Sequence, residues 1–192
     1  MAGLSLLLST ACALAAASLQ PSTEDDLQAK SRKGKELMAS GRYAEAVPVY
    51  RALVKAMPGN PGLLVNLGMA LHLAGQDREA VPQLEAALRL QPDSLPAALF
   101  LGAADLRLGR LAAAATALQK AVRLQPENTD ARSMLVEALV GLEQFDRAES
   151  HLRWLSERTP SDPTTWLKLG RTYEALAAQA GSELLTRNGE SA

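Results

Sequence analysis

Four prolines at a constant spacing place the strongest constraint on how this 192-residue chain can fold. Pro58, Pro92, Pro126 and Pro160 are each 34 residues apart. In the segment before each of them, an alanine is followed four residues later by leucine or tyrosine. A fixed period of this length indicates stacked supersecondary units and not a single globular core.

Each period contains two apolar segments of helical spacing separated by a short polar turn. The predicted helices cover residues 27–40, 44–56, 62–74, 78–90, 96–108, 111–124, 130–141, 145–157 and 164–179. Helices of three to four turns are not stable alone in water, so they must be held by packing on their neighbours. Residues that can cap a helix through a side-chain oxygen stand before the first helix of the second to fifth units. They are Asn60, Ser94, Asn128 and Asp162.

The repeated residues resemble the tetratricopeptide repeat (TPR), a 34-residue helix–turn–helix unit. The second copy supplies Leu64, Leu67-Gly68, Leu71, Ala80, Leu84, Ala87 and Pro92, and the third supplies Leu101-Gly102, Ala114, Leu118, Ala121 and Pro126. The resemblance implies an all-α fold, a right-handed α-solenoid spanning residues 27–180. Its repeats are expected at 27–60, 61–94, 95–128 and 129–162, with a partial repeat at 163–180. Residues 181–192 depart from the pattern and are expected to form a frayed or truncated tail, either a natural cap or a truncation.

Small residues recur at matching positions of the two helices of a repeat. Glycine in mid-helix costs about 0.5–1 kcal/mol relative to alanine, which is tolerable where the missing side chain lets another helix approach. The glycines at 34, 68, 102 and 170 are therefore expected to contact the alanines at 46, 80, 114 and 148 of the second helices.

The first nineteen residues form an apolar segment that ends at Gln20-Pro21. It resembles the hydrophobic region of a secretory signal, although no Lys or Arg precedes it. Residues 1–19 are accordingly predicted to be a signal peptide or a membrane anchor, followed by a polar lead-in at 20–26. A mis-assigned start or a cytosolic extension is the remaining alternative. Because the single cysteine, Cys12, lies in this segment, a cleaved protein would have no thiol.

Composition and motifs favour neither catalysis nor nucleic-acid binding. The formal net charge is −1, whereas nucleic-acid-binding proteins usually carry a basic face. The two histidines, His72 and His151, lie in different repeats, which favours surface or groove positions over a metal site or a nucleophile–base pair. The sequence predicts no enzyme, no cofactor and no metal. One charge, Asp105, takes a position that leucine or tyrosine holds in the other copies; it is expected to be solvated at the rim or paired with Arg132.

Members of the TPR family generally grip peptides or helices on the exposed stripe of their first helices. The matching positions here are apolar in the middle and charged at the ends, which favours an apolar or amphipathic protein segment as partner. For Leu73 and Leu106, packing between adjacent first helices is an equal alternative. The candidate groove residues are Lys35, Met38, Val65, Asn66, Met69, His72, Leu73, Leu99, Ala103, Leu106, Arg107, Glu137, Val140 and Arg171.

The predicted function is therefore a non-catalytic scaffold for protein–protein interaction, exported to the periplasm or cell envelope of a bacterium or secreted. The alternative function is a regulatory or targeting module of a larger enzyme or transport assembly. If the N-terminal segment is not cleaved, it is the expected membrane contact, with the repeats outside the cytoplasm.

Overall fold

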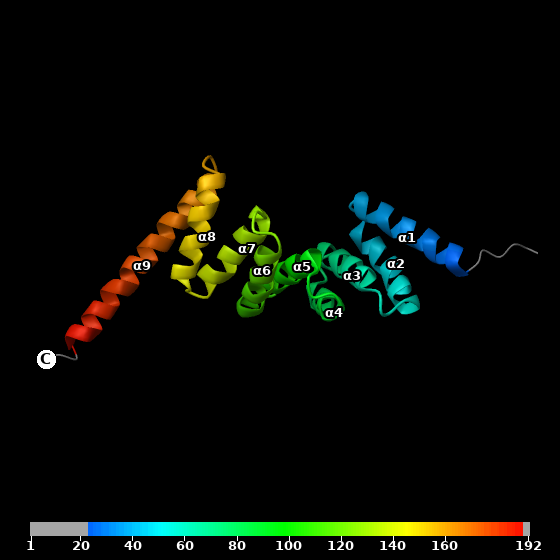
Figure 1. Cartoon of the computed structure of the whole chain (residues 1–192), viewed down its shortest axis with the longest axis horizontal. Helices are drawn as coiled ribbons and strands as arrows, with labels where there is room; N and C mark the ends of the chain where they lie inside the picture. The colour runs from blue at the N-terminus through cyan, green and yellow to red at the C-terminus, as the bar shows by residue number, and fades with distance from the viewer. Residues whose placement is uncertain (1–22, 190–192) are drawn as a thin grey trace, which may run out of the picture.

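Helices account for all the secondary structure between residues 23 and 189, the part of the chain that the computed structural model describes. The predicted signal segment at 1–19 lies outside this part. Figure 1 shows the helices in one elongated row, with α1 and α9 at opposite ends. Their bounds are α1 Thr23–Ala39, α2 Tyr43–Ala56, α3 Pro61–Leu73, α4 Asp77–Leu90, α5 Leu95–Arg107, α6 Leu111–Leu124, α7 Thr129–Gly141, α8 Phe145–Arg158 and α9 Pro163–Gly189. The predicted all-α solenoid is confirmed.

Side-chain caps define where α3, α5, α7 and α9 begin. The oxygen Oδ1 of Asn60 accepts a hydrogen bond from the backbone N–H of Leu63 (3.2 Å), and Oδ1 of Asn128 accepts one from Ala131 (2.8 Å). Ser94 and Asp162 cap α5 and α9 in the same way. These bonds satisfy backbone donors that have no partner within the helix, and all four caps agree with the sequence.

The turn between the two helices of a repeat needs a left-handed residue. Glycine supplies it in the first three repeats, with φ of +73° at Gly41, +80° at Gly75 and +71° at Gly109. The fourth repeat places Glu143 there, with φ of +58°. A side chain in this conformation is strained, so the fourth turn is less favourable than the other three.

The repeats stack so that the first helix of each repeat lies in an inner layer. Neighbouring helices pack on each other along the chain, and α5 additionally contacts both α3 and α7. The corresponding pairs of second helices are further apart. The exposed surface of α1, α3, α5, α7 and α9 is called the inner face below.

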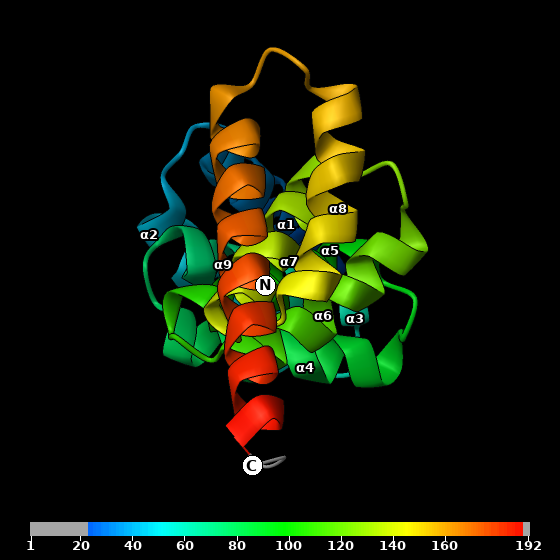
Figure 2. The same cartoon turned by 90° about the vertical axis from the view of Figure 1, so that its left-hand side faces the viewer.

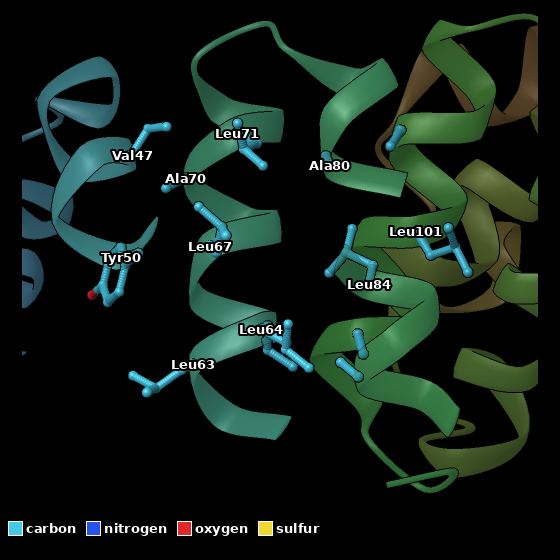
Figure 3. Close-up of a cluster of buried hydrophobic side chains, with 14 of the residues drawn as sticks. Val47, Tyr50, Leu63, Leu64, Leu67, Ala70, Leu71, Ala80, Leu84 and Leu101 are labelled. Atoms are coloured by element: carbon cyan, nitrogen blue, oxygen red, sulfur yellow. The ribbon is translucent and has the colours of Figure 1, made fainter. Parts of the chain in front are cut away.

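Leucine, alanine and valine build a core that is continuous from repeat to repeat. In Figure 3, Leu64, Leu67 and Leu71 project from α3, with Tyr50 of α2 on one side and Leu84 of α4 on the other. Each of these five side chains is at least 95% buried. The core therefore holds together helices that would be unstable alone.

The mid-helix glycines make room for a residue other than the one predicted. A Cβ atom at Gly68 would lie 2.5 Å from Cγ of Leu84, and one at Gly102 would lie 2.4 Å from Cγ of Leu118. The nearest atoms belong to a leucine four residues after the predicted alanine, and this leucine fills the space over the glycine. A Cβ at Gly170 of α9 meets no atom within 4 Å.

Most helix limits lie within one residue of those predicted, and two differ by four residues or more. Helix α1 begins at Thr23, inside the predicted polar lead-in, because acidic residues in a first turn favour the helix dipole. Helix α9 runs through Gly181 to Gly189, past the expected end at residue 179. Both halves of α9 keep good helix formers around the single glycine, whose cost of about 1 kcal/mol does not stop the helix.

Asp105 is paired, as one of the two predictions expected, but the predicted rim position and the predicted partner Arg132 are both wrong. Its side chain is buried, with 3% exposed, and its ion pair is with Arg110 at 3.7 Å. Arg132 instead donates to the carbonyl of Pro126 (2.7 Å) and lies 3.9 Å above the ring of Trp154. Burial raises the pKa of Asp105, and the charge of Arg110 opposes this shift.

Candidate binding groove

All fourteen predicted groove residues lie on first helices, from α1 to α9. The first helices α3, α5 and α7 contact one another in sequence, so the predicted residues on these three helices share the inner face. The structure brings seven of the fourteen into two neighbouring pockets and leaves the other seven outside them.

The first of the two, called the central pocket here, has a volume of about 280 Å³ and lies where α3, α5 and α7 meet. Its lining combines apolar and charged side chains. The lining residues are His72, Ala103, Leu106, Arg107, Met134 and Glu137, of which all but Met134 are predicted groove residues. Leu106 is partly buried against the core, so it contributes both to helix packing and to the pocket.

A hydrogen-bonded triad fixes the polar wall of the central pocket. Nδ1 of His72 lies 2.5 Å from Oδ1 of Asp77, and Nε of Arg107 lies 2.8 Å from Oδ2 of the same carboxylate. Arg107 also donates from Nη1 to the backbone carbonyl of His72 at 3.1 Å. Because an ionised carboxylate only accepts, we assign the imidazole proton to Nδ1, which leaves Nε2 as its remaining polar atom.

Burial and a ring contact hold this triad in one geometry. Asp77 and His72 are 6% and 8% exposed, and Asp77 opens α4, where the helix dipole favours a negative charge. The ring of Phe100 meets the imidazole edge to face at 5.7 Å. The buried carboxylate of Asp77 has charge-assisted hydrogen bonds to both His72 and Arg107. These bonds hold the Arg107 side chain in place on the inner face.

The second, called the terminal pocket, has a volume of about 320 Å³ and lies between α7 and α9. Val136, Val140 and Phe145 form its apolar side, and Glu137 stands on the side nearer the central pocket. Its remaining lining residues are Lys168, Arg171 and Thr172 of α9. Because Glu137 lines both pockets, the two form one continuous region of the inner face.

The remaining predicted groove residues lie outside both pockets. Val65 is only 8% exposed and belongs to the core, and Met38, Met69 and Leu99 are partly buried against it. Lys35 and Leu73 are exposed, and Asn66 is half-buried. A role in binding for these seven residues stays a prediction.

Sequence similarity agrees with this architecture. A sequence model of the tetratricopeptide repeat matches residues 37–104 and 105–171, which is more than half of the chain. The chain belongs to the tetratricopeptide-repeat family. A comparison with curated protein sequences gives no match.

Solved structures of other TPR proteins have the same fold. A crystal structure of MamA superimposes with a TM-score of 0.74 at 22% identity, over 85% of this chain and 90% of that one. MamA from Desulfovibrio magneticus gives 0.73 at 21% identity, over 86% and 94%. The first TPR domain of Spaghetti (RPAP3), bound to the HSP90 peptide SRMEEVD, gives 0.58 at 26% identity, over 61% and 93%.

Several residues of the TPR pockets were not predicted from sequence. Asp77 falls in a turn by composition, and only its spacing from His72 across that turn hints at a contact. Met134, Phe145, Lys168 and Thr172 come from positions that the groove stripe of the family does not emphasise. They enter the pockets because the repeats rotate relative to one another.

Two kinds of feature are absent between residues 23 and 189. In this range, no three His, Cys, Asp or Glu side chains gather as a metal ion would require. Within the same range, no helix has the length and apolar character needed to cross a membrane. His72 contacts Asp77 and Phe100 through its ring and Arg107 through its backbone carbonyl.

Proposed function

We propose that this TPR protein is a non-catalytic scaffold that binds another protein through its inner face. The observation that carries the proposal is the pair of adjoining pockets, which share Glu137 and together span α3 to α9. Pockets of this kind accept individual side chains of a partner segment, while the surface between them accepts its backbone.

The lining favours a segment with apolar anchors and charged flanks. Leu106 and Met134 offer apolar surface in the central pocket, and Val140 and Phe145 offer it in the terminal pocket. Charges of both signs surround these surfaces, so a strongly acidic or strongly basic partner gains no uniform attraction. An amphipathic helix with apolar residues at helical spacing fits this arrangement best.

The basic clamp that some TPR relatives use for a C-terminal carboxylate is not reproduced here. Asn66 is present, but Pro96 and Phe100 stand where the later basic residues belong. Phe100 packs on His72, so its place is part of an apolar contact. The peptide bound by the RPAP3 domain therefore supports peptide binding by this chain, but not the same ligand chemistry.

A photo-cross-linking experiment tests the proposal. A photoreactive amino acid at Val140, on the terminal pocket, is compared with one at Ala113, an exposed residue of α6. We expect cross-links to a partner from position 140 and none from position 113. Equal cross-linking at both positions contradicts the proposal, and so does unchanged capture of the partner by a separate Val140→Glu variant. A catalytic subunit cross-linked at position 140 would identify the scaffold as a module of a larger assembly.

We further propose that the protein is exported across a bacterial inner membrane. The support is the apolar segment at 1–19, with its small residues before Gln20-Pro21. N-terminal sequencing of protein from periplasmic and membrane fractions tests this. A mature protein that starts near residue 20 is expected, whereas an intact Met1 in the membrane fraction supports an anchor and an intact Met1 in the cytosol contradicts export.

A further inference from the structure

One face of α9 has no helix packed on it. The glycine position that is covered by Tyr50, Leu84 and Leu118 in the first three repeats is open at Gly170. Tyr173 lies at the edge of this face: its hydroxyl donates to Oε1 of Glu149 on α8 (2.9 Å), while 43% of the residue stays exposed. In a complete repeat, the second helix covers this face. In α9 the corresponding apolar surface is therefore exposed.

The chain does not form that second helix, because the residues that would supply it continue α9. Helix α9 is 27 residues long, whereas the first helices α3, α5 and α7 have 13. Figures 1 and 2 show its second half projecting past α8, away from the stack. In this half, Leu184 is 62% exposed.

The open glycine and the exposed leucine lie on one stripe of α9. Gly170, Tyr173, Ala177, Gly181 and Leu184 follow each other at spacings of three and four residues, which puts them along one side of a helix. All five are exposed, and a Cβ at Gly181 also meets no atom within 4 Å. Along this stripe, each glycine has a large side chain at the same distance on the other side of Ala177. Gly170 matches Leu184 in this way, and Gly181 matches Tyr173.

We propose that α9 pairs antiparallel with α9 of a second copy of this chain, about a two-fold axis at Ala177. In this register Leu184 of each copy lies over Gly170 of the other, as Leu84 lies over Gly68 within one chain. Tyr173 of each copy lies over the open Gly181 of the other. A two-fold interface requires a self-complementary surface, and here both the gaps and the side chains that fill them lie on one helix.

This interface is separate from the groove of the proposed function. Among the five stripe residues, none lines the central or the terminal pocket. The dimer would therefore present two inner faces, each still open to a partner. A helix of another protein or a further segment of the same polypeptide are the other possible occupants, and the experiment below distinguishes them.

Cysteine cross-linking tests the two-fold axis directly. The experiment uses the full-length chain carrying Cys12→Ser. In it, Ala177→Cys places the new thiol of one copy next to the same thiol of the second copy, within the reach of a disulfide. Ala178→Cys, equally exposed and one residue away, points to the side and is the matched control. We expect a disulfide-linked dimer from Ala177→Cys under mild oxidation and little from Ala178→Cys. Equal linking of the two variants overturns the proposed register.

Sedimentation of the reduced protein tests the association itself. We expect a concentration-dependent dimer that Leu184→Glu weakens at least tenfold, while Leu90→Glu, at a residue of α4 that is 53% exposed, leaves it unchanged. Gly170→Ala should raise the thermal midpoint of the monomer yet weaken the dimer, because its Cβ would occupy the place of Leu184. A wild-type protein that stays monomeric, or a dimer insensitive to Leu184→Glu, refutes the proposal, and circular dichroism confirms that each variant is folded.

Discussion

The same substitution at two equivalent glycines should have opposite effects on stability. Gly68 and Gly170 occupy the same position of their repeats, but only Gly68 is covered by a second helix. Gly68→Ala places a Cβ 2.5 Å from Cγ and 2.6 Å from Cδ2 of Leu84, which is fully buried. Gly170→Ala places its Cβ in open space.

The magnitudes follow from two opposing contributions. Alanine in place of a mid-helix glycine stabilises the helix by about 0.5–1 kcal/mol. Overpacking a tight core costs about 1–3 kcal/mol, because Leu84 cannot move its branch carbon without displacing its neighbours. We therefore expect Gly68→Ala to lower the free energy of unfolding by about 0.5–2 kcal/mol. Gly170→Ala should raise it by about 0.5–1 kcal/mol.

Urea and thermal unfolding followed by circular dichroism measure both effects. The comparison is made at a protein concentration at which sedimentation shows a monomer, so that any association through α9 does not contribute. For a chain of this length, 1 kcal/mol corresponds to a shift in Tm of roughly 2–4 °C. If both variants move the midpoint in the same direction, the assignment of Leu84 as the residue that fills the glycine gap is wrong.

Three further predictions concern single side chains. Asp105→Leu should raise the free energy of unfolding at neutral pH by about 1–4 kcal/mol, because a buried and poorly paired charge is replaced by an apolar side chain. Burial raises the pKa of Asp105, so the wild type should lose stability as pH rises from about 4 through this raised pKa, whereas a flat difference between the two proteins over that range would contradict the burial. Glu143→Gly should raise stability by about 1 kcal/mol, since glycine adopts φ of +58° without strain; an unchanged urea midpoint counts against this. Asn128→Ala should cost about 0.5–2 kcal/mol and cost more than Ser94→Ala, whose cap bond is longer at 3.4 Å, and the reverse order in denaturation would refute the ranking.

The repeat architecture could be predicted because it depends on local patterns. The cap residues and the period of helix and turn each act within a few residues, so a single sequence contains enough information to locate them. Contacts between helices were harder to predict from the sequence. The residue that fills the gap at Gly68 was predicted to be Ala80, but it is Leu84, one helical turn further along. Which side of a second helix faces the first depends on how the two helices rotate as they pack, and sequence spacing does not specify that rotation.

The groove residues were likewise predicted where they depend on local patterns and missed where they depend on contacts between repeats. The stripe of first-helix positions was predicted from the family resemblance, and seven of its residues line the two pockets. The role of Asp77 was not predicted, because it bonds to His72 across a turn and to Arg107 of the next repeat. Contacts between repeats bring together residues about 34 positions apart, and their distances depend on the accumulated packing of three helices.

By itself, the sequence determined that this chain is a helical solenoid of TPR repeats, where all its helices but the first begin, and which helices carry the inner face. These properties follow from hydrogen-bonding caps, turn residues and apolar periodicity, all of which act locally. Only the tertiary structure decided that Asp105 is buried beside Arg110, that the inner face contains two adjoining pockets, and that α9 extends past the stack with Gly170 uncovered. Each of these depends on whether another helix is present to fill space or exclude water, and that can be known only when the helices are placed together.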